Sequence, residues 1–175
     1  MAKTDNLHGK DAPARRLDAF DRKILSALEK DGSRGYAALG QEVGLSAPAV
    51  HERVKKLRAA GILRGMAPVM DPVAVGKPLL AFVHVDTVGW GKSRQTMALA
   101  DHPEVEEIHS VAGDTCLLLK VRTRDTGDLE ALLSLLYATP GVKATRSYVV
   151  LTTYLERPVQ AGITETWPVI DHEPA

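Results

Sequence analysis

Small and cationic side chains are combined in one short stretch of the chain, residues 46–58, with the sequence SAPAVHERVKKLR. On a helix, Val50, Val54 and Leu57 fall within an arc of about 60°, which predicts that they pack inward. The outward side chains then begin with small residues and continue with charged ones. Such a face suits the major groove of DNA, because small residues allow close approach and cations neutralise phosphates. The residues expected to contact DNA are Ser46, Ala47, Pro48, His51, Glu52, Arg53, Lys55, Lys56 and Arg58.

Two other interpretations of this stretch remain open. Taken alone, it could be an ordinary amphipathic helix whose charges are solvated. Arg53 borders the apolar arc, so it could pair with Asp18 or Asp21 instead of contacting DNA. Glu52 could serve only to balance Lys56 four residues later.

The elements around this stretch form a recognisable order. Apolar residues at helical spacing predict a helix within 17–31 and a shorter one over 36–43, before the helix that ends near residue 60. The last two are joined by a turn of about three residues, which predicts a helix-turn-helix. We expect residues 62–63 and 69–70 to add a short β wing.

The pattern changes after the Pro- and Gly-rich run DPVAVGKP, which ends a linker. Strands are predicted over 79–87, 105–112, 115–122 and 142–155, with helices over 92–101 and 125–138. The order βαββαβ predicts a ferredoxin-like sandwich, and Gly113-Asp114 is a two-residue hairpin signal. The fold class is therefore α+β, with an N-terminal winged helix-turn-helix joined to a C-terminal ferredoxin-like domain. The expected boundaries are a flexible tail 1–16, the winged helix-turn-helix 17–66, the linker 67–78, the ferredoxin-like domain 79–155 and a C-terminal extension 156–175.

The strands also predict a partner. Two helices cover only one face of a four-stranded sheet, and a sheet with a solvated second face should alternate cleanly between apolar and polar residues. The segments LLAFV, CLLL and YVVL do not alternate. The second face is therefore expected to pack on another copy in a two-fold dimer, because no remaining segment is long enough to form a third layer.

Composition narrows the class of protein. Residues 15–66 hold 11 Lys/Arg against 6 Asp/Glu, whereas 67–175 hold 9 against 14, so two oppositely charged modules are expected. The single cysteine, Cys116, excludes an internal disulfide and fits the cytoplasm. The polar N-terminus and the lack of a long apolar run predict neither a secretory signal nor a membrane span. The six histidines show no metal-ligand spacing.

Taken together, these residues resemble the Lrp/AsnC (feast/famine) family of transcriptional regulators. The matching features are LD-x-x-D-x-x-IL-x-x-L at 17–28, GLS at 44–46 and RV-x-x-L at 53–57, followed by GI at 61–62. HSVAGDTCLLLKVR, PGV at 140–142 and TRSYVVL at 145–151 match as well. The resemblance implies a DNA reader joined to a RAM-type effector domain that binds amino acids or related metabolites. It also implies homodimers through that domain, often assembled into octamers.

The resemblance places the effector near the hairpin at Gly113-Asp114. Backbone N–H groups at a turn suit a carboxylate, and Asp114 suits an ammonium group. The family pattern Gly-Asp-aromatic-Asp is Gly-Asp-Thr-Cys here, so no particular amino acid carries over, and a plain tight turn is the alternative. The candidate effector-binding residues are His109, Ala112, Gly113, Asp114, Thr115 and Cys116, with Thr126, Tyr148 and Val149 added by the resemblance.

The expected function is sequence-specific binding of double-stranded operator DNA, modulated by an amino-acid-like effector, with no metal or other cofactor. One alternative is a stand-alone metabolite-sensing and interaction module that does not bind DNA and uses its helix-turn-helix to dock another protein. An enzyme is the other, because His109, Asp114 and Cys116 lie close in sequence. Cys116 sits within a strand pattern as a small apolar filler, so we expect no enzymatic activity.

Overall fold

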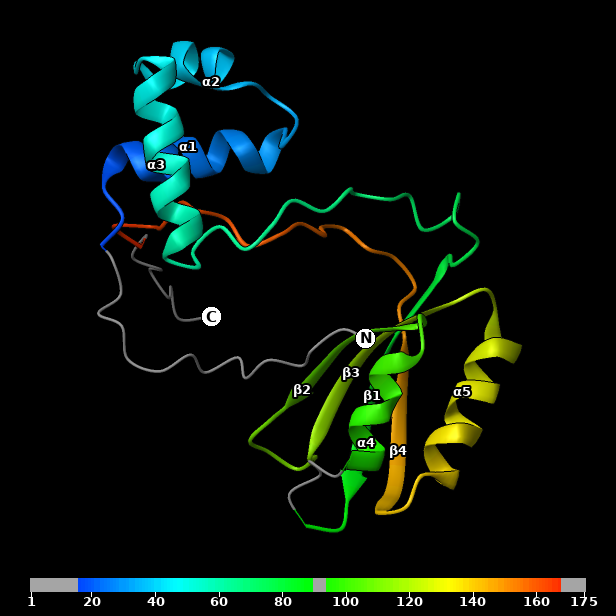
Figure 1. The fold of residues 1–175 in the computed structure, drawn as a ribbon. Helices are drawn as coiled ribbons and strands as arrows, with labels where there is room; N and C mark the ends of the chain where they lie inside the picture. The colour runs from blue at the N-terminus through cyan, green and yellow to red at the C-terminus, as the bar shows by residue number, and fades with distance from the viewer. Residues whose placement is uncertain (1–15, 90–93, 168–175) are drawn as a thin grey trace, which may run out of the picture. The chain divides into compact units, whose positions relative to one another are not determined.

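The computed structural model describes residues 16–89 and 94–167 (Figure 1). The chain divides into two compact units. Within the described residues, the helical unit comprises 16–67 together with 157–167, and the sheet unit comprises 68–89 and 94–156.

The helical unit is built on helices α1 (Ala19–Lys30), α2 (Tyr36–Val43) and α3 (Ala47–Ala59). Ser46 caps α3 by accepting a hydrogen bond from the backbone N–H of Ala49 at 3.4 Å. Gly44 ends α2 with φ of 75°, a left-handed conformation that favours glycine. A Cβ on Gly40 would lie 2.4 Å from the carbonyl oxygen of Leu45, so only glycine lets the turn close. The core of this unit is Ile24, Ala27, Leu28, Leu39, Val43, Val50, Val54 and Leu57.

The expected β wing is wrong: residues 60–78 contain no strand. The backbone N–H groups of Ile62 and Leu63 instead donate to the carbonyl of Leu57, at 3.0 and 3.2 Å, and so cap α3. Both side chains pack against the three-helix core. Val69 is 92% exposed and Pro68 has no N–H to donate, so this segment offers little to a ladder.

The sheet unit has the ferredoxin-like order, so the α+β class is confirmed. The elements are β1 (Leu79–Thr87), α4 (Arg94–Met97), the 3-10 helix η1 (Ala98–Asp101), β2 (Val105–Ser110), β3 (Leu117–Thr123), α5 (Thr126–Ala138) and β4 (Val142–Val149). The four strands are arranged β2-β3-β1-β4 with every neighbour antiparallel, and the helices lie on one face (Figure 1). Residues 92–93 of the expected first helix lie outside the described residues.

The last strand is shorter than expected, ending at Val149 and not at residue 155. Among the described residues its partner strand is β1, which begins at Leu79, and the final bond runs from Val150 N–H to the Leu80 carbonyl at 2.9 Å. Beyond that point the described part of the chain offers no further strand to pair with, and Leu151 is 96% exposed. Backbone pairing therefore decides the length, although the sequence remains apolar.

The two faces of the sheet differ in chemistry. The helix-covered face holds a dry core of Ala81, Val83, Val85, Leu99, Leu117, Leu119, Val121, Leu129, Leu132 and Leu136. On the opposite face, called the open face below, Phe82 lies between Lys120 and Tyr148 in register, and His84 lies between Leu118 and Arg146. The open face thus mixes large apolar side chains with charges.

Candidate functional site

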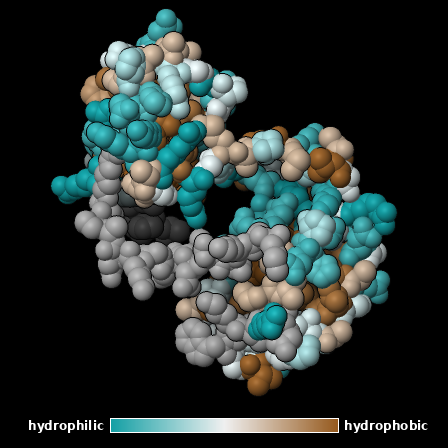
Figure 2. Space-filling model, viewed as in Figure 1, coloured by the Kyte–Doolittle hydropathy of each residue, from teal (hydrophilic) through white to brown (hydrophobic). Residues whose placement is uncertain are grey.

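The third helix buries one side and exposes the other. Val50, Val54 and Leu57 are at most 1% exposed, as their spacing predicted. His51, Glu52, Lys55, Lys56 and Arg58 are exposed, as are Ser46 and Pro48 at the start of the helix, and Ala47 is half-buried. In Figure 2 the described surface of the helical unit is mostly hydrophilic. The exposed face therefore offers cations and small residues to a polyanion.

Arg53 is the exception among the expected DNA contacts. Its Nη1 lies 2.7 Å from Asp18 Oδ2 and 2.9 Å from Asp21 Oδ1, which is the open alternative raised above. Hydrogen bonds to the Asp21 backbone N–H and to Arg53 hold the pKa of Asp18 below its usual value. The guanidinium also lies 5.4 Å from the Phe20 ring centroid. Arg53 therefore ties α3 to α1, and its role as a DNA contact stays a prediction.

A contact that the sequence analysis missed joins α2 to this exposed face. The rings of Tyr36 and His51 lie with their centroids 5.1 Å apart and their planes inclined by 42°. The two residues are 15 positions apart on different helices, and no local pattern connects them.

The loop between β2 and β3 holds most of the expected effector residues. It spans residues 111–116, and Val111 N–H donates to the Cys116 carbonyl at 3.2 Å. The expected two-residue hairpin turn is wrong, because Gly113 has no positive φ, β2 already ends at Ser110 and β3 begins only at Leu117. The exposed stretch of this loop is 112–114, which leaves its backbone accessible to a ligand.

The flanks of this loop are fixed by specific contacts. The Thr115 hydroxyl is buried and donates to the Val85 carbonyl at 3.2 Å. Arg146 Nη2 donates a hydrogen bond to the backbone carbonyl of Asp114 at 3.3 Å. This bond involves the backbone of Asp114 and not its side-chain carboxylate. His109 Nε2 lies 2.7 Å from Glu107 Oε2. Hydrogen bonding with Thr87 lowers the pKa of the Cys116 thiol.

The three residues added by resemblance lie at the other end of the sheet. Val149 and Tyr148 pair with the start of β1, and Thr126 follows the end of β3, whereas the 111–116 loop precedes β3. The ends of β3 are about 20 Å apart at the rise of an extended strand. One copy of the chain therefore does not bring the two groups together.

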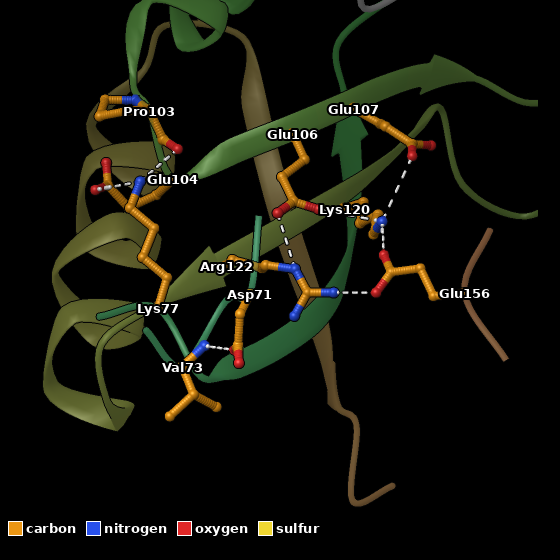
Figure 3. Close-up of polar contacts among 10 residues, drawn as sticks. All are labelled: Asp71, Val73, Lys77, Pro103, Glu104, Glu106, Glu107, Lys120, Arg122 and Glu156. Carbon is orange, nitrogen blue, oxygen red and sulfur yellow. Dashed lines mark hydrogen bonds and ion pairs between the residues drawn. The ribbon is translucent and has the colours of Figure 1, made fainter. Parts of the chain in front are cut away.

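A charged cluster on the open face was also missed by sequence reasoning (Figure 3). Arg122 Nε lies 2.8 Å from Glu106 Oε1, and its Nη2 lies 2.5 Å from Glu156 Oε2. Lys120 pairs with the same two glutamates. Burial lowers the pKa of Lys120, but its hydrogen bonds to Glu156 and Glu106 outweigh that effect and raise it overall. The hydrogen bond from Lys120 holds the pKa of Glu156 below its usual value.

The described part of the chain contains a cavity in the sheet unit but no group of candidate metal ligands. No group of three or more His, Cys, Asp or Glu residues is placed to hold a metal ion within 16–89 and 94–167. Over the same ranges, none of the helices is long and apolar enough to cross a membrane. A cavity of about 350 Å³ beside the first turns of α5 is lined by His102, Glu104, Asp128, Ala131, Leu132 and Leu135.

Two models of one protein family match this chain. Residues 17–58 match the AsnC-type helix-turn-helix domain, and residues 80–160 match the Lrp/AsnC ligand binding domain. The HTH-type transcriptional regulator FL11 of Pyrococcus horikoshii is 34% identical over 140 residues, which cover 80% of this chain and 93% of the relative. The leucine-responsive regulatory protein of Escherichia coli K12 is 36% identical over 147 residues, covering 81% and 89%.

Solved structures agree over both units. An AsnC family transcriptional regulator from Agrobacterium tumefaciens matches with a TM-score of 0.76 and 28% identity, covering 81% of this chain and 94% of that one. The transcriptional regulator NMB0573 of Neisseria meningitidis, solved as a complex with L-Met, matches with a TM-score of 0.74 at 28% identity and the same coverage.

Proposed function

The chain belongs to the Lrp/AsnC family of helix-turn-helix transcriptional regulators with an amino-acid-binding domain, and from this premise we propose that it reads its operator with the exposed face of α3. The observation that carries the proposal is the division of α3 between the buried stripe of Val50, Val54 and Leu57 and the exposed cationic side. The ion pairs of Arg53 support the same orientation, because they tie the edge of the helix to α1.

The roles on this face follow from position and charge. Ser46, Ala47 and Pro48 stand at the N-terminal end of α3, which enters the major groove first, and meet the backbone or base edges. His51, Glu52 and Lys55 reach bases or phosphates. Lys56 and Arg58, in the last turn, bind phosphates and supply affinity without sequence information.

Two readers are needed for a two-fold operator, and the open face of the sheet supplies the contact between copies. Phe82, Leu118 and Tyr148 give that face large apolar side chains, and Tyr148 is 56% exposed in the single copy. A symmetric dimer would bury them and place two α3 helices on half-sites about 34 Å apart. Further assembly into an octamer would use other surfaces of the sheet unit. The proposed location of such a DNA-binding regulator is the cytoplasm.

The amino-acid effector binds at the 111–116 loop of one copy, with His109 beside it. Backbone groups at 112–114 receive the carboxylate, and Asp114 receives the ammonium group. Thr115 and Cys116 hold the base of the loop through Val85 and Thr87. Thr126, Tyr148 and Val149 join the site from a second copy, because they lie at the far end of the same sheet. Effector binding then changes the assembly and so the spacing of the readers.

A gel-shift titration with the upstream region of the chain's own gene tests the DNA-reading role. Replacing both Lys55 and Lys56 with Ala removes two cations from the exposed face. It should weaken binding by at least tenfold at low salt and reduce the salt dependence of the wild type. Lys30→Ala, an exposed lysine at the end of α1, is the matched control. Unchanged affinity in the double variant, or wild-type binding that ignores salt, would favour the stand-alone metabolite-sensing module.

Effector binding is tested separately by thermal shift against the twenty amino acids. Asp114→Ala should abolish any stabilisation that the wild type shows, because a ligand stabilises only the state that binds it. A shift that persists in this variant would move the effector site away from the loop.

A further inference from the structure

The contact between Tyr36 and His51 joins an anchored ring to a ring on the proposed DNA-reading face. Tyr36 is the first residue of α2, is half-buried and packs against the three-helix core. The side chain of His51 is 55% exposed. One ring is therefore held by the core while the other is carried at the surface of α3, so the contact restricts the surface ring.

The position of His51 makes its orientation important. It lies one turn after Ala47, the first residue of α3, in the part of a reading helix that meets base edges. An exposed histidine samples several rotamers, whereas hydrogen bonding to a base edge needs one defined direction. The neighbouring carboxylate does not supply it, because Glu52 Oε1 is 3.9 Å from His51 Nδ1, too long for a hydrogen bond.

We propose that Tyr36 is a positioning residue for sequence readout, whose ring holds the His51 imidazole in the direction from which a ring nitrogen reaches a base edge. The inference rests on the DNA-reading role of α3 proposed above, and it adds a residue of α2 to those that determine specificity. An aromatic contact of this kind changes rotamer populations by about twofold to tenfold. The loss of Tyr36 should therefore cost discrimination between base pairs more than general affinity for DNA.

The test uses the full chain and a duplex selected from a random library by the wild type. Dissociation constants are measured for that duplex and for each of its single-base-pair changes. Tyr36→Leu keeps an apolar side chain but removes the ring, Tyr36→Phe keeps the ring, and His51→Ala removes the reader. Tyr36→Leu and His51→Ala should lose discrimination at the same base pairs, by about threefold to tenfold for Tyr36→Leu. Tyr36→Phe should match the wild type.

Double variants separate positioning from other roles. Tyr36→Leu should cost nothing further in a His51→Ala background, because its effect passes through the imidazole. Lys55→Ala is the matched control on the same face, and its effect should multiply with that of Tyr36→Leu. The proposal would be overturned if the fold-losses in base-pair discrimination caused by Tyr36→Leu and His51→Ala multiplied in the double variant. Equal loss of affinity for every duplex, or a Tyr36→Phe variant as impaired as Tyr36→Leu, would overturn it too, since the hydroxyl would then serve as a phosphate contact.

Two further readouts keep the outcome decisive. Circular dichroism melting establishes that Tyr36→Leu is folded at the assay temperature. Nuclear Overhauser contacts between the Tyr36 and His51 rings, measured on the wild type, do not depend on any variant, and their absence would refute the positioning role. A wild type that selects no sequence from the library would overturn the reading function of α3 itself. Selection with multiplying variant effects would overturn only the role of Tyr36.

Discussion

Replacing Glu156 with Gln should destabilise the sheet unit, and by an amount that depends on pH. Glu156 accepts hydrogen bonds from Lys120 and Arg122 on the open face. The substitution keeps the shape of the side chain but removes its charge. The two cations keep Glu106 as a partner, so the cluster is weakened without being left wholly unpaired.

The magnitude follows from the exposure of the partners. The side chains of Arg122 and Lys120 are only 10% and 16% exposed, whereas that of Glu156 is 41% exposed. A fully exposed pair contributes about 0–1 kcal/mol and breaking a buried pair costs about 3–5 kcal/mol. In a single copy of the chain the half-exposed carboxylate is screened by solvent, so we expect a loss of about 1–2 kcal/mol at pH 7. The urea midpoint should fall by about 0.5–1 M.

The pH dependence has a definite sign. The hydrogen bond from Lys120 holds the pKa of Glu156 below its usual value in the folded protein. A carboxyl group of this kind stabilises the fold above its unfolded pKa, and that stabilisation is lost as the pH falls through the folded pKa. The difference between wild type and E156Q should therefore be full at pH 7 and should shrink toward zero as wild-type Glu156 becomes protonated.

Urea unfolding followed by far-ultraviolet circular dichroism, at pH 7 and at pH values below the unfolded pKa, checks both statements. Glu165→Gln is the matched control, an exposed glutamate on the same C-terminal segment, and it should change the midpoint little. An E156Q variant as stable as wild type at pH 7, or a difference that stays constant down to acid pH, would refute the reasoning.

Three other substitutions test the remaining contacts. Arg53→Met should lower the free energy of unfolding by about 1–2 kcal/mol in urea titrations, yet reduce DNA affinity in gel shifts far less than loss of the α3 lysines. Arg22→Ala removes the 2.6 Å hydrogen bond to the Ala161 carbonyl. Because this bond holds the segment after Arg157 against α1, its loss should make trypsin cleavage after Arg157 about fivefold faster. The control variant Lys23→Ala should be cleaved at the wild-type rate. Leu118→Asp on the open face should convert a dimer to a single copy in light scattering, and a persisting dimer would place the interface elsewhere.

Features set by neighbours in the chain could be predicted from sequence. The buried stripe of Val50, Val54 and Leu57 recurs at helical spacing along α3, so its periodicity indicates it directly. The βαββαβ order was predicted for the same reason, since each element carries its own pattern. The motifs that resemble the Lrp/AsnC family lie on these same elements.

Features that depend on distant partners were missed or wrong. The wing failed because Ile62 and Leu63 donate to Leu57, and the last strand ended early because β1 offers no partner beyond Leu80. The tight hairpin failed because backbone pairing ends before Gly113. In each case the local sequence is compatible with more than one structure, and the available backbone hydrogen-bond partners determine which one forms.

The side-chain pairs that matter most for function belong to the second group. The sequence left open whether Arg53 contacts DNA or forms an ion pair, and the structure shows an ion pair in which Arg53 Nη1 lies 2.7 Å from Asp18 Oδ2. The Tyr36–His51 contact and the pairing of Arg122 with Glu156 join residues 15 and 34 positions apart. Local spacing specifies which face of an element a side chain occupies. Only the packing of elements specifies which side chain it contacts there, because residues far apart in the sequence come within contact distance only in the folded chain.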